Sequence, residues 1–351
     1  MLYLSTRTHK LYPMTVKLGI IGAGWIADKM GETLKGLKND EVIPYAISSR
    51  SLDKAQAFAE HWGFQKAYGS YDEMLADPEV NLVYVATPHS HHFAHSKMAI
   101  EAGKPVLCEK AFTANAREAE ELIKIAHEKK VFITEAIWTR YMPLSTKIKE
   151  LIDSGFIGRP RLIVASLCYA MEGKERIVRP DLCGGALLDL GVYCINFARM
   201  FFGSDFETLN TNCIKGESGT DMYDTIVLKY ADGKMANLVT SCLGRCNREG
   251  LIVGDDAYIV VDNVNCPQSA KVYDKDYKLV AEYYPPKEQV TGYEWQVLAC
   301  KEALENGWLE SPYMPHAETI SIMRQMDALR KEWDVRFPMD KLLHTVREVC
   351  H

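Results

Sequence analysis

The stretch VKLGIIGAGWIA, from Val16 to Ala27, decides the fold of this chain. Its first six residues are mostly apolar, as in a strand that is buried on both faces, and the glycines that follow end that strand. Residues 25–37 then have the composition of a helix. A strand, a tight glycine turn and a helix in this order predict the first half of a βαβ unit.

The same alternation continues to about residue 137. Strand-like and helix-like segments follow one another, which predicts right-handed crossovers and a parallel sheet covered by helices on both faces. We therefore expect a doubly wound α/β Rossmann domain over residues 15–137. The predicted strands are 42–49, 81–88, 104–110 and 131–138, and the predicted helices are 25–37, 51–63, 91–103 and 115–130.

The remainder of the chain, residues 138–351, has a different pattern. One long helix is predicted from Gly184 to about Phe202, and β-rich segments with polar turns follow it, including a hairpin turn at 231–234. Two helices, at about 293–306 and 317–332, close the pattern. We expect an α+β domain with a mostly antiparallel sheet over 138–351, and an N-terminal extension over 1–14.

Composition restricts the class of protein. A length of 351 residues exceeds what one core usually holds, about 250–300 residues, and so favours two domains. A net charge of −6 argues against a nucleic-acid partner. The ten cysteines lack the paired spacing of a zinc site, which indicates reduced thiols in a cytoplasmic protein. We see no run of about 20 apolar residues and expect no membrane partner.

The glycine turn has the spacing G-x-G-x-x-A, with Gly22, Gly24 and Ala27. Gly22 permits the tight turn, Gly24 lets the backbone approach a pyrophosphate, and Ala27 lets the helix pack closely on the sheet. The helix that starts at Trp25 and Ile26 offers free N–H groups to the phosphates. We expect a dinucleotide site here; the alternative is a glycine turn without a ligand.

The second strand ends in Ser49 and Arg50, where an NAD enzyme usually carries an acidic residue. A hydroxyl and a guanidinium fit a 2′-phosphate, because arginine presents a fork of donors that matches phosphate oxygens. We therefore expect NADP. NAD stays possible if Arg50 only stacks on the adenine or caps the next helix.

The third strand ends in the histidine-rich segment 86–95. Its histidines would allow a metal site, but no acidic or cysteine partner lies at ligand spacing, and we expect no metal. The segment should instead lie beside the nicotinamide half of the cofactor. We assign Thr87, Pro88 and His92 to the cofactor side, with His92 capping or packing the following helix.

Two further segments carry the catalytic candidates. Glu109 and Lys110 stand at the carboxyl end of the fourth strand, where ligands bind in open α/β sheets, so we assign both to the cofactor side as well; the alternative for Lys110 is an ordinary surface lysine. Asp189 and Tyr193 are four residues apart on the predicted helix and so share one face. Their alternative is a buried tyrosine bonded to a helix-capping aspartate.

The stretches GIIGAGWIA, VATPHSHHFAH, AGKPVLCEK and GGALLDLGVY resemble the glucose-fructose oxidoreductase and inositol dehydrogenase family, called Gfo/Idh/MocA. This resemblance spans nearly the whole chain from about Val16. It implies a second domain with an open sheet that forms a dimer face. The family's essential lysine falls on Lys110 and its helix aspartate on Asp189.

Many family members have histidine where this chain has Tyr193, and the tyrosine variant is similar to the dihydrodiol dehydrogenase branch, which also acts as NADP-dependent D-xylose dehydrogenases. Three positions depart from the family pattern. Ala111 replaces the proline of E-K-P, Cys183 replaces a glycine, and His89 stands where asparagine is common.

The resemblance implies hydride transfer between nicotinamide and a carbinol carbon of a sugar, polyol or cyclic trans-diol. Tyr193 would act as acid or base, with its pKa lowered by Lys110, and Asp189 would orient Lys110 or the substrate. Either Lys110 or Tyr193 could carry the proton.

We expect Trp138, Arg140 and Arg176 to contact the substrate, although each, taken singly, also fits a structural role.

Two other functions stay open. The chain could be a non-catalytic NAD(P)-binding redox sensor, or a family enzyme that reduces another C=O, C=N or C=C substrate. The resemblance implies a homodimer or higher homo-oligomer.

Overall fold

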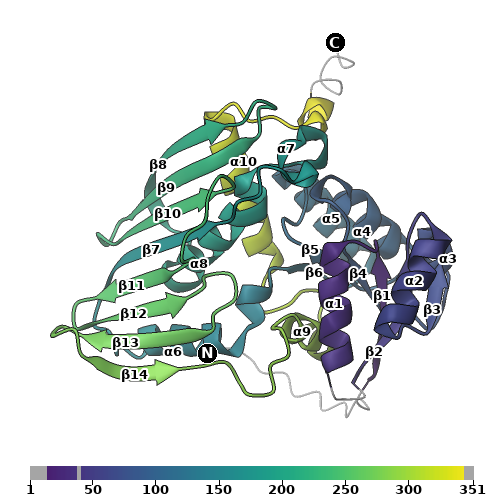
Figure 1. Cartoon of the computed structure of the whole chain (residues 1–351), viewed down its shortest axis with the longest axis horizontal. Coiled ribbons are helices and arrows are strands. Elements are labelled where there is room, and N and C mark those ends of the chain that lie inside the picture. Colours follow the sequence, from purple (N-terminus) through teal and green to yellow (C-terminus); the bar gives the residue numbers. More distant parts are fainter. Residues whose placement is uncertain (1–13, 38–40, 344–351) are drawn as a thin grey trace.

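A computed structural model describes residues 14–37 and 41–343, so the predicted extension, apart from Met14, lies outside the described residues. The described chain forms two sheets, each with its own helices (Figure 1). The smaller sheet holds the N-terminal strands, and the larger one is built from the C-terminal half of the chain.

The N-terminal sheet is parallel throughout, with the strand order β3-β2-β1-β4-β5-β6. The order reverses between β1 and β4, and in such sheets a crevice forms beyond the carboxyl ends of the strands at this point. This confirms the Rossmann prediction. The strands are β1 (Val16–Ile21), β2 (Val42–Ser48), β3 (Lys66–Tyr68), β4 (Leu82–Val85), β5 (Val106–Glu109) and β6 (Ile133–Ala136).

The helices between these strands begin where the sequence supplies a cap. The Ser51 side chain accepts from the Lys54 N–H at the start of α2, and the Asn115 side chain accepts from the Glu118 N–H at the start of α5. The helices of this half are α1 (Trp25–Gly36), α2 (Leu52–Trp62), α3 (Tyr71–Leu75), α4 (His92–Glu101) and α5 (Ala116–Lys129). The sequence pattern does not predict β3 or α3, because three and five residues carry too little periodicity.

The C-terminal sheet has the strand order β14-β13-β12-β11-β7-β10-β9-β8. Only β7 and β10 pair in parallel, so the sheet is mostly antiparallel, as the sequence predicts. The pattern does not predict β7, β8 or β14. The strands are β7 (Pro160–Cys168), β8 (Phe206–Lys215), β9 (Asp221–Tyr230), β10 (Met235–Ser241), β11 (Gly250–Gly254), β12 (Ala257–Asp262), β13 (Ser269–Asp274) and β14 (Leu279–Tyr283).

One face of this sheet packs against helix α8 (Val192–Phe202), mainly through β7 and β10. Along β9, buried residues alternate with half-buried ones, which is the period of a sheet with one covered face. The opposite face carries half-exposed apolar side chains such as Leu162, Val164 and Val227.

Three further helices connect the two halves. Helix α6 (Pro143–Asp153) follows the Rossmann strands, α9 (Glu294–Glu305) packs on α1, and α10 (His316–Glu332) packs on α5. Because α9 and α10 return to the first half, a boundary at residue 137 stays a prediction. The short helices are η1 (His89–His91), η2 (Trp138–Tyr141), α7 (Glu175–Val178), η3 (Pro180–Leu182), η4 (Leu187–Gly191) and η5 (Pro338–Leu343).

The segment Pro180–Phe202 is long and apolar enough to cross a membrane, which the sequence reading did not anticipate. However, 94% of its most apolar window is buried inside the protein. It is therefore a core segment. It is also not one regular helix, because η4 is a π-helical turn that precedes α8.

Candidate active site

Gly22 adopts a φ of +97°, a conformation that residues with a side chain rarely adopt. A Cβ at this position would lie 2.9 Å from Thr87 Cγ2 and 3.0 Å from the Ala86 carbonyl oxygen. The turn after β1 therefore requires glycine for its backbone conformation and for its close approach to the end of β4.

Gly24 is the N-cap of α1, and no side chain caps this helix end. A Cβ on Gly24 would meet no atom within 4 Å, so the backbone borders open space. Trp25 is 67% exposed, Ile26 is half-buried, and Ala27 is fully buried against the sheet. An uncapped helix N-terminus beside an open space fits a pyrophosphate.

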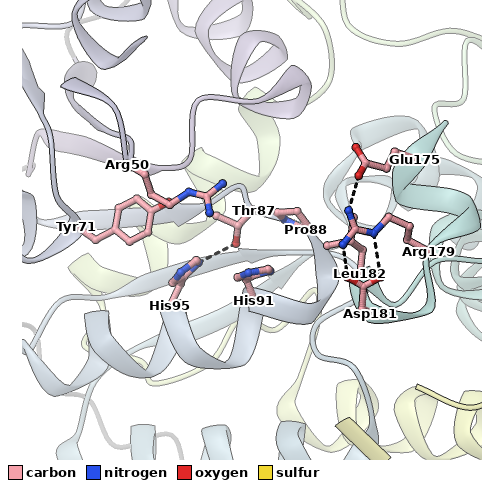
Figure 2. Close-up of a pocket in the computed structure, with 10 residues that line it drawn as sticks. All are labelled: Arg50, Tyr71, Thr87, Pro88, His91, His95, Glu175, Arg179, Asp181 and Leu182. Carbon is pink, nitrogen blue, oxygen red and sulfur yellow. Dashed lines mark hydrogen bonds and ion pairs between the residues drawn. The ribbon is translucent and has the colours of Figure 1, made fainter. Parts of the chain in front are cut away.

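A pocket of about 520 Å³ lies next to this turn, between the Rossmann strand ends and residues 175–182 (Figure 2). Arg50 reaches over it from the end of β2, and His91 and His95 point into it from below. Ser49 lies outside the lining, and its hydroxyl accepts from the Ser51 N–H. The lining residues are Arg50, Tyr71, Thr87, Pro88, His91, His95, Glu175, Arg179, Asp181 and Leu182.

Of the described arginines that line the pocket, one is free to bind an anion. Arg179 pairs with Glu175 and Asp181, whereas no ion pair within the described residues involves Arg50. Burial and the charge of Arg50 lower the pKa of His91, and burial, His91 and Arg50 lower that of His95 to about 4. Neutral histidines beside a free guanidinium fit a phosphate-bearing ligand.

His92 is not among the residues that line the pocket, and its assignment to the cofactor stays a prediction. Its ring is fully buried, with Nε2 2.7 Å from the Thr87 carbonyl oxygen and Nδ1 2.8 Å from the Ala111 carbonyl oxygen. It ties the end of β4 to the segment after β5 and packs beneath the pocket wall.

Lys110 follows β5 directly and turns towards the second half of the chain. Its Nζ donates to the Asp189 carbonyl oxygen at 2.7 Å and to Asp189 Oδ1 at 3.1 Å. Both side chains are largely buried, with 12% and 6% exposed. The Lys110–Ala111 peptide bond is cis.

Asp189 lies in the π-helical turn η4, and a buried carboxylate holds the start of this turn in place. The buried carboxylate of Asp221 accepts the Leu187 N–H at the start of the turn. A Cβ on Gly185 would overlap Asp221 Oδ1, and Gly185 has a φ of +130°, so this approach requires glycine. The glycines before the turn therefore allow a buried carboxylate to fix the position of Asp189.

Tyr193 joins the same cluster. The Nζ of Lys110 lies 5.0 Å from the centroid of the Tyr193 ring, a cation–π contact. The expectation that Lys110 lowers the pKa of Tyr193 is wrong. Burial, followed by the nearby Tyr293, Glu109 and Asp189, raises that pKa well above its usual value.

Glu109 is not among the residues that line the pocket, and its carboxylate bonds groups on β4 and next to β5. One carboxylate oxygen accepts the Lys110 N–H at 3.1 Å, and the other bonds the hydroxyl of Tyr84 on β4. Burial raises the pKa of Glu109 to about 7. Glu109 therefore supports the segment that carries Lys110, and its assignment to the cofactor stays a prediction.

The three residues that were predicted to contact the substrate lie in different surroundings. Arg176 reaches the cluster, since its Nη1 lies 2.6 Å from Asp189 Oδ1, and 46% of its side chain remains exposed. Arg140 does not, because its buried guanidinium pairs with Glu318 at 2.6 Å and also bonds Asn196. These contacts give Arg140 a structural role, and a substrate contact for it stays a prediction.

Trp138 forms an aromatic wall with Tyr293. The two rings stack with centroids 3.9 Å apart and an interplanar angle of 12°. The Trp138 Nε1 is buried and lies near the Tyr193 hydroxyl, whose pKa it lowers against the larger effect of burial. Trp138 thus stands beside the Lys110 cluster.

Sequence reasoning did not find Tyr84, Tyr293 or Asp221. For Tyr84 a signal existed, because a hydroxyl in an otherwise apolar buried strand needs a partner. Tyr293 and Asp221 come from distant segments and carry no local signal. Among the described residues, no group of three or more His, Cys, Asp or Glu is placed to hold a metal ion.

These features define an NAD(P)-dependent oxidoreductase. Residues 16–136 match the sequence model of an oxidoreductase family with an NAD-binding Rossmann fold, and residues 145–260 match the GFO/IDH/MocA C-terminal domain. The chain belongs to the GFO/IDH/MocA family.

Full-length relatives support this membership. The chain is 32% identical to trans-1,2-dihydrobenzene-1,2-diol dehydrogenase of Danio rerio, over 93% of this chain and 99% of the relative. It is 33% identical to D-xylose 1-dehydrogenase (NADP(+)) of Hypocrea jecorina, over 93% of this chain and 94% of the relative.

The fold is similar to that of a 3-ketoreductase from Actinomadura kijaniata solved with NADP and TDP-benzene. The TM-score is 0.80 at 24% identity, with 90% of this chain and 97% of that chain covered.

Proposed function

We propose that this protein is an NADP-dependent dehydrogenase that transfers a hydride between nicotinamide and a carbinol carbon of a sugar, polyol or cyclic trans-diol. The observation that carries the proposal is the convergence of Lys110, Asp189 and Tyr193 at the carboxyl end of β5. The named substrates of the two relatives, a cyclic diol and D-xylose, support the substrate class.

The cofactor would lie across the carboxyl ends of β1, β2 and β4. When bound, nicotinamide supplies the hydride chemistry, and the protein supplies position and charge. Gly22 and Gly24 would bring the backbone and the start of α1 to the pyrophosphate. Arg50, the free cation of the pocket, supports NADP over NAD, because it is suited to a 2′-phosphate.

Tyr193 and Lys110 would handle the proton. Because its pKa is raised, the Tyr193 hydroxyl stays protonated at neutral pH and is suited to donate to a substrate oxygen. Lys110 is held by Asp189 and would polarise the same oxygen with its positive charge. Asp189 thus acts as the positioning residue for Lys110.

The substrate would lie against Trp138 and Tyr293. Their stacked rings offer an apolar surface for a sugar or diol ring. Arg176 stands at the open edge of the site and could bond a further hydroxyl.

The proposal has a direct test. Purified protein is incubated with NADP or NAD and a panel of aldoses, inositols and cyclic diols, and the reduced nicotinamide is followed by absorbance. We expect turnover with at least one polyol and a preference for NADP. Tight cofactor binding without turnover of any polyol would favour the redox-sensor function instead.

We also propose a cytoplasmic homodimer. The half-exposed face of the C-terminal sheet carries Leu162, Val164, Val227 and the stacked pair Tyr258 and Tyr273. A broad apolar sheet face of this kind is suited to association with a second copy.

A further inference from the structure

Cys168 and Cys246 lie side by side outside the proposed catalytic cluster. Cys168 is the last residue of β7, and Cys246 lies in the loop between β10 and β11. This loop approaches β7 in the antiparallel direction, because Gly250 pairs with Ala165 and the Ser166 N–H donates to the Glu249 carbonyl oxygen at 3.1 Å.

The loop therefore brings Cys246 to the face of β7 that carries both Ser166 and Cys168, since residues two apart in a strand share a face. The Cys246 Sγ lies 3.6 Å from Ser166 Oγ, and Cys168 and Cys246 are close enough for each to shift the pKa of the other.

The surroundings of Cys246 favour a thiolate. Its Sγ accepts the Arg248 N–H at 3.3 Å and has the Ser166 hydroxyl and the Cys168 thiol as further partners. Burial opposes ionisation, but these hydrogen bonds hold the pKa of Cys246 below its usual value. Burial and Cys246 raise the pKa of Cys168 to about 12. One thiol is thus activated, and the other is a buried neighbour.

Cys213 shows that access to solvent does not by itself lower the pKa of a cysteine. It is the other half-exposed cysteine of the described chain, but burial and the acidic side chains of Asp224 and Asp221 raise its pKa. The remaining described cysteines are buried. In a single copy of the chain, Cys246 alone among them combines access to solvent with a lowered pKa and a thiol neighbour.

We propose that Cys246 and Cys168 form an oxidation site that reacts with hydroperoxides and closes to an intramolecular disulfide. The Cys246 thiolate attacks one peroxide oxygen, the O–O bond breaks, and the departing hydroxide takes up a proton to give water. Cys246 is then a sulfenic acid.

The Cys168 sulfur next attacks the Cys246 sulfur, and the S–O bond breaks. The leaving oxygen departs as a second water with the proton of the Cys168 thiol. Two thiols and one hydrogen peroxide thus give one disulfide and two waters.

The position of this disulfide gives it a structural consequence. Tyr169 follows Cys168, and its hydroxyl accepts from Arg248 Nη1 at 3.0 Å. Tyr169 is also close enough to Tyr293 to raise its pKa. The disulfide would therefore join the two segments that carry the Tyr169–Arg248 contact, beside the aromatic wall.

The test is made on the purified full chain and needs no substrate. The protein is labelled with limiting iodoacetamide, digested and analysed by mass spectrometry. We expect Cys246 to be alkylated at least about tenfold faster than Cys213, because the thiolate is the reacting species. Equal rates at the two cysteines would overturn the proposal.

A second sample is treated with hydrogen peroxide before excess alkylation. We expect a linked pair of peptides containing Cys168 and Cys246, which dithiothreitol separates. Cys168→Ser should replace the link by a sulfenic acid on Cys246 that dimedone traps, and the control Cys213→Ser should keep the link. If both cysteines of the wild-type chain can still be alkylated after peroxide treatment, the proposal is overturned. This outcome does not depend on whether the variants fold.

Discussion

The Nζ of Lys110 lies 3.1 Å from Oδ1 of Asp189 and 2.7 Å from its carbonyl oxygen, so one ammonium group joins the end of β5 to the π-helical turn η4. Burial raises the pKa of Asp189, but Lys110 and Arg176 outweigh this effect and hold it well below its usual range. The carboxylate therefore stays charged at neutral pH and keeps Lys110 in place.

Replacing Lys110 by methionine should abolish turnover, with a loss of at least about 10³-fold in kcat, because the charge that polarises the substrate oxygen is removed. Cofactor affinity should change little, since Lys110 is outside the pocket of Arg50. Steady-state kinetics and cofactor titration measure the two quantities. Lys124→Met, at a side chain that is 75% exposed, serves as the control. Persisting activity in Lys110→Met would contradict the assignment.

Tyr193→Phe should lower kcat by about 10²-fold or more and leave cofactor binding nearly intact, because only the proton-donating hydroxyl is lost. The ring and its contact with Lys110 remain, so the fold should be retained. Tyr277→Phe, at an 80% exposed ring, is the matched control. An unchanged kcat for Tyr193→Phe would assign the proton to Lys110.

Arg50→Gln should raise the KM for NADP by about 10-fold to 100-fold, because a charge-assisted bond to the 2′-phosphate is lost. The KM for NAD should stay within about twofold, since NAD has no phosphate there. The ratio of kcat/KM for the two cofactors is the measurement, and NAD is the internal control. A parallel loss with both cofactors would show that Arg50 does not read the 2′-phosphate.

Glu135 gives a prediction for stability against pH. Its buried carboxyl accepts the Phe112 N–H at 3.2 Å, and burial raises its pKa to about 7 from a usual value of 4.5. The folded state therefore holds this proton more tightly than the unfolded state. The stability that Glu135 contributes is present below about pH 4.5 and is lost as the pH rises to about 7.

Over that window the loss is on the order of 3 kcal/mol for the wild-type chain. Glu135→Gln keeps an acceptor oxygen but cannot ionise, so its free energy of unfolding should fall less between pH 5 and pH 8, about the limits of the window. Urea unfolding at both pH values measures the difference. If the free energy of unfolding falls equally between the two pH values in the wild-type chain and in Glu135→Gln, the raised pKa of Glu135 is contradicted.

Val164→Arg should convert the proposed dimer to a monomer, because it places a charge in the middle of the half-exposed sheet face. Sedimentation velocity measures the state. Phe156→Arg adds the same charge at a 47% exposed residue that is outside the strands, and it should stay dimeric. A wild-type chain that sediments as a monomer would rule out the interface.

The Rossmann half could be predicted because β1, β2, β4 and β5 are nearly continuous apolar runs that are followed within a few residues by glycine, proline or a charged residue. Val106–Glu109 is one such run, and it locates Lys110 at a strand end. The C-terminal sheet was harder. Phe206–Lys215 contains Glu207, Thr208, Asn210 and Asn212, so this half-exposed edge strand lacks an apolar signal.

The spatial meeting of Lys110, Asp189 and Tyr193 follows from local features, a strand end and a helix face. The pKa values of these side chains do not follow from local features, because they depend on groups from distant segments. Tyr293, which raises the pKa of Tyr193, is 100 positions away. The ion pair of Arg140 could not be predicted for the same reason, since its partner Glu318 comes from the last long helix.

The π-helical turn η4 makes the length of this segment a constraint in its own right. A π-helical turn is one residue wider than an α-helical one, and each residue rotates a helix by about 100°. Shortening Leu187–Gly191 by a single position would remove the extra residue and make the turn an α-helical one, which changes the rotation between Asp189 and the helix that follows. Substitutions at the apolar positions of this turn can be absorbed by repacking, whereas insertions and deletions cannot.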